Sequence, residues 1–309
     1  IPGVGALASG DDGPSTVLGT GRGSSAGIAA LANGSLMHSL EYDDTHTASV
    51  VHGSSVLASA ALAVAEQVAA DGEDLVRAFA VGWEFFVRIG LASPGRLQAR
   101  GFQVTSAGGA FAAAAISALL HRDDRGIFAN AIGIAGSQAG GTFAFLADGD
   151  TVKAAQAGWA AHSGVMAAEL ARAGVSGPRG VFDGPYGFYR LYAQDDGAGA
   201  RLMESCESLG EVWHLPDAAF KLLPCCHYLH PFVEALTEAL ADGVQAEDVV
   251  SIHCEVPEEV VPIIAEPWPD RQAPARTQDA RWSLPYVLGR VLRHGRLDAE
   301  LRHDGPVVG

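Results

Sequence analysis

The stretch that decides the fold reads Ala32-Asn33-Gly34-Ser35-Leu36-Met37-His38-Ser39-Leu40-Glu41-Tyr42-Asp43-Asp44-Thr45-His46, and it closes at His52-Gly53. It starts inside an apolar pattern over residues 24–40 whose spacing fits one face of a helix. It then gathers carboxylates, a hydroxyl and imidazoles between Glu41 and His52. Polar groups packed this closely behind an apolar helix indicate a site rather than a solvated surface.

Helical patterns continue on the C-terminal side of this stretch. They are interrupted by the breakers Asp71-Gly72, Ser93-Pro94-Gly95 and Gly174, and no strand pattern lies among them. The further helices are predicted over residues 54–70, 73–89, 105–121, 124–137 and 151–173. Abundant alanine and glycine favour close helix packing. Taken alone, these patterns also describe a helical bundle of no particular function.

The composition changes after Gly177-Pro178, and residues 178–200 are predicted to be a loop. Helices are expected over 230–241 and 280–293, with a Pro-rich linker over 262–278. Residues 249–256 alternate polar and apolar side chains and form the best strand pattern in the chain. We therefore expect a mainly α protein with two domains: a large all-helical domain over 1–217, and a smaller α/β (α+β) lid over 218–309 that is incomplete at its C-terminus.

The bulk composition excludes several classes of function. A net charge of −16 provides no basic surface for nucleic acid. No apolar run is long enough to span a bilayer, and no signal peptide is visible. The four cysteines show no zinc-site spacing and are interpreted as free thiols in a reducing compartment. These features predict a cytoplasmic protein that binds neither nucleic acid nor membrane.

Three residues are candidates for handling a carboxylic acid. His52 has a side chain that can exchange a proton near neutral pH, although a lone histidine is often a core or capping residue. Lys153 stands alone in a long apolar region, where it could hold a substrate carboxylate or simply begin a helix. Arg281 could clamp a carboxylate or lie at an ordinary helix start.

The acidic turn permits two further interpretations. Glu41, Asp43 and Asp44 could bind a metal together with His46 and His52, but the spacing matches no closed site, and we predict no metal. Alternatively, Asp43 and Asp44 cap a helix and orient their neighbours. The adjacent Cys225 and Cys226 could include a nucleophile, but buried supporting roles are favoured.

The order of these landmarks resembles that of the MmgE/PrpD family. The resemblance spans residues 25–295 by eye. Its landmarks are the run His38–His46 with His52-Gly53, Gly101-Phe102-Gln103, Lys153 with Gly158-Trp159-Ala160-Ala161-His162-Ser163-Gly164, Phe220-Lys221 with Pro224-Cys225-Cys226, and Asp279-Ala280-Arg281-Trp282-Ser283-Leu284-Pro285-Tyr286.

This resemblance implies a cofactor-free lyase or isomerase that acts on small di- or tricarboxylic acids as a homodimer. It implies that His52 transfers the proton, that Lys153 and Thr45 hold substrate carboxylates, and that Tyr286 approaches from the lid. The expected catalytic residues are thus His52, Lys153 and Tyr286. The expected substrate-binding residues are Glu41, Asp44, Thr45, His46, Gln103 and Arg281.

Three positions depart from the family pattern. Glu41 stands where the family usually has Asp, and Gln103 where it commonly has His. Cys226 stands where decarboxylases have His. Glutamine forms hydrogen bonds but does not exchange protons at neutral pH. The family resemblance predicts a dehydratase or decarboxylase. The lack of a titratable group at Gln103 slightly favours the alternative, an isomerase or epimerase, and a non-catalytic carboxylate-binding protein is the third interpretation.

Overall fold

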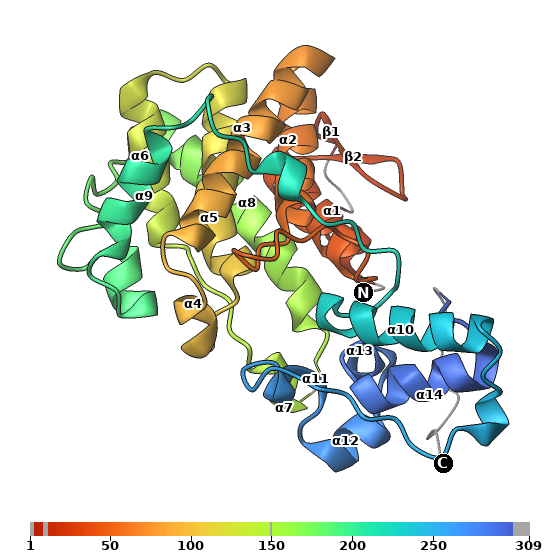
Figure 1. The fold of residues 1–309 in the computed structure, drawn as a ribbon. Helices are drawn as coiled ribbons and strands as arrows, with labels where there is room; N and C mark the ends of the chain where they lie inside the picture. Colours follow the sequence, from red (N-terminus) through yellow and green to blue (C-terminus); the bar gives the residue numbers. More distant parts are fainter. Residues whose placement is uncertain (1–2, 9–11, 149, 299–309) are drawn as a thin grey trace. The chain divides into compact units, whose positions relative to one another are not determined.

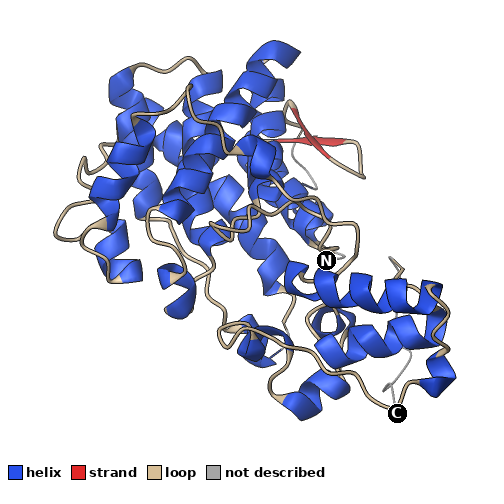
Figure 2. Cartoon of the chain, viewed as in Figure 1, coloured by secondary structure: helices blue, strands red, loops and turns tan. Residues whose placement is uncertain are grey.

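The computed structural model describes residues 3–8, 12–148 and 150–298, and most of its regular structure is helical (Figure 2). The predicted mainly α class is confirmed. The chain divides into two compact units. Unit 2 consists of the short segments Leu40–Tyr42 and Phe145–Thr151 and the chain from Lys221 onward, and unit 1 holds the remainder. Because a division into compact units does not test where independent domains begin, the boundary predicted after residue 217 stays a prediction.

Unit 1 is built from six long helices, each close to a predicted one (Figure 1). They are α1 (Ala26–His38), α2 (Gly53–Val68), α3 (Gly72–Leu91), α5 (Val104–Leu120), α6 (Arg125–Gly136) and α8 (Val152–Arg172). Helix α5 is buried on nearly all faces, as its Ala-rich sequence predicts. Shorter elements of unit 1 are η1 (Val4–Ala8), α4 (Arg96–Ala99), η2 (Tyr189–Ala193), α9 (Ala198–Cys206) and η3 (Leu215–Asp217).

Glycines on α8 set how closely the central helices approach. A Cβ on Gly158 would lie 2.1 Å from the carbonyl oxygen of Leu31 in α1. A Cβ on Gly164 would lie 2.4 Å from the Cβ of Ala113 in α5. Because neither contact leaves room for a methyl group, α8 crosses both neighbours at backbone distance. This packing fixes α1 and α5, whose ends carry His38 and Gln103.

The small sheet lies at the start of unit 1. Strands β1 (Ser15–Val17) and β2 (Arg22–Ser24) form an antiparallel hairpin (Figure 2). The strand predicted over 249–256 is wrong, because all eight of these residues are described and none is in a strand. Val250 is 99% exposed. Side-chain alternation fits a strand, but strand formation also needs a hydrogen-bonding neighbour, and the described chain gives this segment none.

Unit 2 is helical among its described residues. Its main helices, α10 (His230–Ala241) and α14 (Leu284–His294), pack on each other over a core that includes Leu229, Val233 and Val287. The segment predicted as a linker instead holds α11 (Val261–Ile264), α12 (Trp268–Gln272) and the start of α13 (Thr277–Ala280). The remaining elements are α7 (Phe145–Asp148), η4 (His227–Leu229) and η5 (Ala246–Asp248). Over the described residues, every helix is too short or too polar to span a membrane.

Candidate functional site

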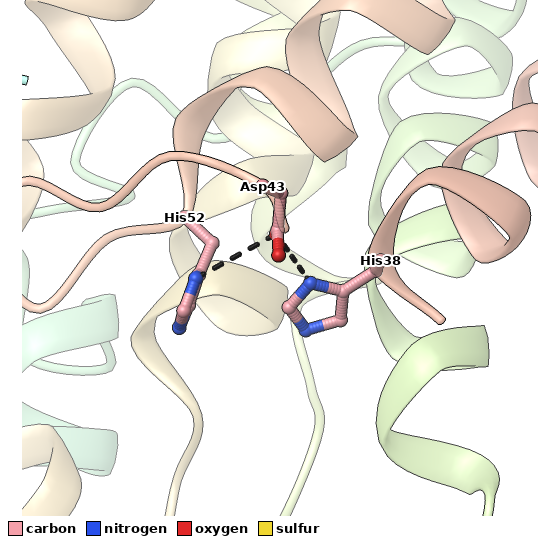
Figure 3. Close-up of side chains that lie close together, drawn as sticks. All are labelled: His38, Asp43 and His52. Atoms are coloured by element: carbon pink, nitrogen blue, oxygen red, sulfur yellow. Dashed lines mark hydrogen bonds and ion pairs between the residues drawn. The ribbon is translucent and has the colours of Figure 1, made fainter. Parts of the chain in front are cut away.

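The acidic turn places one carboxylate between two imidazoles (Figure 3). Oδ2 of Asp43 lies 2.5 Å from Nδ1 of His38 and 3.6 Å from Nδ1 of His52. The two rings are 5.0 Å apart between centroids. The side chains of His38 and Asp43 are buried, whereas that of His52 keeps 12% of its surface exposed. These three residues form the Asp43 cluster.

Local structure explains why these side chains meet. His38 is the last residue of α1, and His52 is the residue that precedes α2, so the loop between the helices must return on itself. Backbone pairing of His46 with Val51 closes that loop. Thr45 pairs in turn with Ala219, through two backbone hydrogen bonds of 2.9 Å. Helices α1 and α2 therefore fix the two ends of the loop, and the backbone hydrogen bonds of Thr45 and His46 fix its middle.

The Asp43 cluster is suited to proton transfer at His52. Oδ2 of Asp43 is too far from Nδ1 of His52 for a hydrogen bond, but its negative charge favours the tautomer in which this nitrogen carries the proton. Oγ1 of Thr45 lies 3.4 Å from the same nitrogen. In this tautomer the lone pair of His52 is on Nε2, which points away from Asp43 (Figure 3). Asp43 also stabilises the imidazolium that forms when Nε2 takes a proton.

The start of α5 lies next to His52. The backbone N–H of His52 donates to Oγ1 of Thr105 at 3.0 Å. Gln103 occupies the N-cap position of α5, and its Oε1 is buried without a hydrogen-bond partner among the described residues. Because α2 and α5 both begin here, the partial positive charge of two helix N-termini favours an anion nearby.

Asp44 serves the helix that follows it. Its Oδ1 accepts the N–H of Ser54 in the first turn of α2 at 2.8 Å, and its Oδ2 accepts the indole N–H of Trp83 at 3.1 Å. This geometry is that of a capping residue, the alternative raised from the sequence. The predicted substrate-binding role of Asp44 stays a prediction.

His46 points into a different part of the loop. It is 4% exposed, and its Nδ1 lies 2.8 Å from Oγ of Ser49. Burial, and then the nearby His214, lower the pKa of His46, so the ring is neutral at neutral pH. The metal set considered from the sequence is not gathered in one place: His52 and Asp43 form one cluster, His46 belongs to another, and Asp44 caps α2.

Glu41 belongs to unit 2, where it forms a buried ion pair with Lys221. Oε2 of Glu41 lies 3.1 Å from Nζ of Lys221, and both side chains are fully buried. Glu41 has a φ of 58°, a left-handed backbone that is uncommon for a residue with a Cβ. Nη1 of Arg281 donates to the carbonyls of Leu40 and Pro224 at 2.8 and 2.7 Å, so this guanidinium holds two loops of unit 2.

The remaining candidates are also buried. Lys153 lies in the first turn of α8 and is 1% exposed. Tyr286 lies in the first turn of α14, in unit 2, and is likewise 1% exposed. Burial raises the pKa of the Cys225 thiol, which argues against a nucleophilic role. The proposed roles of Lys153 and Tyr286 stay predictions.

Three residues of these sites were absent from the predicted set: His38, Asp43 and Lys221. His38 and Asp43 were part of the quoted stretch, but their meeting depends on how the loop folds back. Lys221 was part of a landmark, and its partner Glu41 lies 180 positions earlier in the chain. The sequence signal for all three was their place in the landmarks rather than any spacing.

Comparisons with known proteins find similarity along most of the chain. The MmgE/PrpD N-terminal domain matches residues 5–200, and the MmgE/PrpD C-terminal domain matches residues 223–307. The cis-aconitate decarboxylase-like protein oryM of Aspergillus oryzae is 31% identical, over 93% of this chain and 62% of its own length. A cis-aconitate decarboxylase of Aspergillus terreus is 31% identical over 71% of this chain and 46% of its own, and that of Homo sapiens is 28% identical over 89% and 57%.

The chain thus spans between 46% and 62% of the length of these relatives. The two domain matches together cover most of its residues and follow one another in the same order as the landmarks. The chain belongs to the MmgE/PrpD family.

Proposed function

We propose that this protein is a lyase that moves a proton on a carbon next to a carboxylate of a small di- or tricarboxylic acid. The observation that carries the proposal is the Asp43 cluster, in which one buried carboxylate contacts the Nδ1 atoms of two imidazoles. The names of the relatives add cis-aconitate as the first substrate to examine.

His52 is the proposed proton-transfer residue. In a dehydration, its Nε2 takes the proton from the carbon beside the carboxylate, the C–H electron pair forms the double bond, and the hydroxyl group takes a proton from solvent and leaves as water. In a decarboxylation, the bond to the departing carboxylate breaks and the carbon takes a proton from His52 in its protonated form. In both reactions Asp43 orients the ring of His52 and stabilises its imidazolium form.

Cationic and dipolar groups of unit 1 are proposed to hold the substrate. Lys153 would neutralise a carboxylate, and Thr45 would donate a hydrogen bond from its hydroxyl. The N-termini of α2 and α5 add partial positive charge near His52. The proposed reaction uses no metal or cofactor. We further propose a homodimer in the cytoplasm as the working form.

Gln103 favours a second candidate, an isomerase or epimerase on the same scaffold. Its buried amide accepts or donates a hydrogen bond but neither gains nor loses a proton at neutral pH. A reaction that removes and returns a proton without expelling a group makes fewer demands on a second acid. Elimination requires a leaving group to be protonated, which Gln103 does not do.

Proton NMR in deuterated buffer separates these candidates. The protein is mixed in turn with methylcitrate, citrate, cis-aconitate and iminodisuccinate, with the His52→Ala variant alongside. New vinyl signals or loss of carbon dioxide, absent in the variant, support a lyase. Deuterium wash-in alone supports an isomerase, and ligand-induced stabilisation without product supports a binding protein. Equal turnover by His52→Ala refutes the role of His52.

A further inference from the structure

A second group of nitrogen and oxygen ligands lies in unit 1, apart from the Asp43 cluster. It consists of His46, His214 and Asp217, and one ligand atom from each lies within 4.8 Å of the others. The rings of His46 and His214 are 6.0 Å apart between centroids. His46 is buried, His214 half-buried and Asp217 exposed, so the group opens from the interior to solvent. We call it the His46 cluster.

His46 is held in an orientation that suits a metal ligand. Oγ of Ser49 lies 2.8 Å from Nδ1 and 3.4 Å from the His46 carbonyl. The backbone N–H of Ser49 donates to the same nitrogen at 3.3 Å, so this turn holds the ring through Nδ1. Nε2 takes no part in these bonds. An ion that binds Nε2 would require the proton of the neutral ring to move to Nδ1, where Oγ of Ser49 can accept it.

The segment that carries the other two ligands is also anchored. Oε1 of Glu84 accepts the N–H groups of His214 and Leu215 at 2.7 and 2.8 Å. Glu84 forms a buried ion pair with Arg88, whose Nη2 donates to the Val212 carbonyl at 2.8 Å. Helix α3 thus fixes the backbone before η3 and leaves the side chains of His214 and Asp217 to adjust.

We propose that the His46 cluster binds one divalent ion of the zinc type through two imidazoles and one carboxylate. Such mixed N and O ligands suit Zn²⁺, Co²⁺, Ni²⁺ and Cu²⁺, and three protein ligands leave an open position for water. Ligands about 2.0–2.2 Å from a tetrahedral ion lie about 3.4 Å from one another. The cluster therefore needs to contract by at most about 1.4 Å, which side-chain rotation at the surface supplies.

The bound ion would join two segments far apart in the sequence. His46 follows Thr45, whose backbone pairs with Ala219, and Asp217 lies two residues before Ala219. An ion held by His46 and Asp217 would therefore link, through side chains, the same two segments that the backbone pairing of Thr45 with Ala219 links. It would stabilise the loop that positions Thr45 without entering the Asp43 cluster. The proposal does not depend on the proposed function.

The test uses untagged protein freed of metal with a chelator. Co²⁺ is titrated while its visible absorption is recorded, and Zn²⁺ is titrated by calorimetry. We expect one ion per chain, and a Tm raised by roughly 5 °C when Zn²⁺ is at about 100 times its Kd. His214→Ala should weaken binding at least about 30-fold, and Asp217→Asn about 10-fold. The control His253→Ala, an exposed histidine elsewhere, should bind like the wild type.

Two results would overturn the proposal. One is the absence of saturable binding to the wild type at micromolar ion concentrations. The other is binding that survives His214→Ala but is lost in His52→Ala, since the ion would then belong to the Asp43 cluster. His214→Ala and Asp217→Asn change side chains outside the buried core, so circular dichroism should show that both variants remain folded.

Discussion

Replacing Asp43 by Asn keeps the size of the side chain but removes the charge that lies between two imidazoles. Without this charge His52 can adopt the tautomer with its proton on Nε2. A ring in that tautomer has no lone pair at the nitrogen that points away from Asp43 (Figure 3). Asp43→Asn should therefore lower kcat and leave KM nearly unchanged.

The size of the effect follows from the 3.6 Å between Oδ2 of Asp43 and Nδ1 of His52. Unit charges at this distance attract by roughly 1 kcal/mol in water and roughly 5 kcal/mol at an effective dielectric constant of about 20. These limits correspond to rate losses of roughly 10-fold and 2,000-fold. Because Asp43 is nearly buried, we expect a loss of about 10²–10³-fold.

Two measurements check this expectation. Steady-state turnover of the acid identified by NMR gives kcat and KM for Asp43→Asn. Nitrogen-15 shifts of the histidine rings report the tautomer of His52 without any substrate. Asp124→Asn, which changes the N-cap carboxylate of α6, is the matched control and should keep wild-type kcat. A folded Asp43→Asn protein with wild-type kcat and an unchanged His52 tautomer would refute the reasoning.

Three further predictions concern stability, measured by urea denaturation. Lys221→Met should cost about 3–5 kcal/mol because it removes the ammonium group that pairs with the buried carboxylate of Glu41. Adding Glu41→Gln should restore most of this stability, and equal stability of the single and double variants would count against the buried pair. Gly158→Ala should cost about 1–3 kcal/mol, whereas Gly72→Ala, where a Cβ meets nothing within 4 Å, should be nearly neutral; similar costs would contradict the packing. Burial lowers the pKa of His230 to about 4, below its value of 6.5 in the unfolded chain, so protonation favours the unfolded chain. The free energy of unfolding should therefore fall by about 1–2 kcal/mol from pH 7 to pH 5. His230→Gln should reduce this loss, and an unchanged pH profile in that variant would exclude His230 as its source.

The helices of unit 1 could be predicted because their signals are local. Apolar spacing and breakers such as Asp71-Gly72 lie within each segment, and Asp71 caps α3 by accepting the Asp74 N–H. The sheet could not be predicted in the same way. Residues 249–256 alternate well but form no strand, while β1 and β2 are only three residues long and carry little pattern. Strand pairing is a non-local property.

The candidate site could be predicted only in part, because residue types are local signals whereas the contacts between them are not. His52, Thr45 and Gln103 were identified by residue type and landmark order. Their geometry depends on contacts between distant segments, such as the hydrogen bond from His52 to Thr105. The contact of His38 with Asp43 needs the loop after α1 to fold back, and the pair of Glu41 with Lys221 joins segments 180 positions apart. Neither is visible in local spacing.

The most direct test of His52 as the proton-transfer residue follows deuterium from solvent into product. Wild-type protein, His52→Ala and His52→Gln are incubated with cis-aconitate in deuterated buffer, and products are examined by NMR and mass spectrometry. We predict that the wild type releases carbon dioxide and forms a product with one deuterium at the protonated carbon, and that both folded variants form none. Product of the same isotopic composition at an undiminished rate from either variant would contradict the assignment.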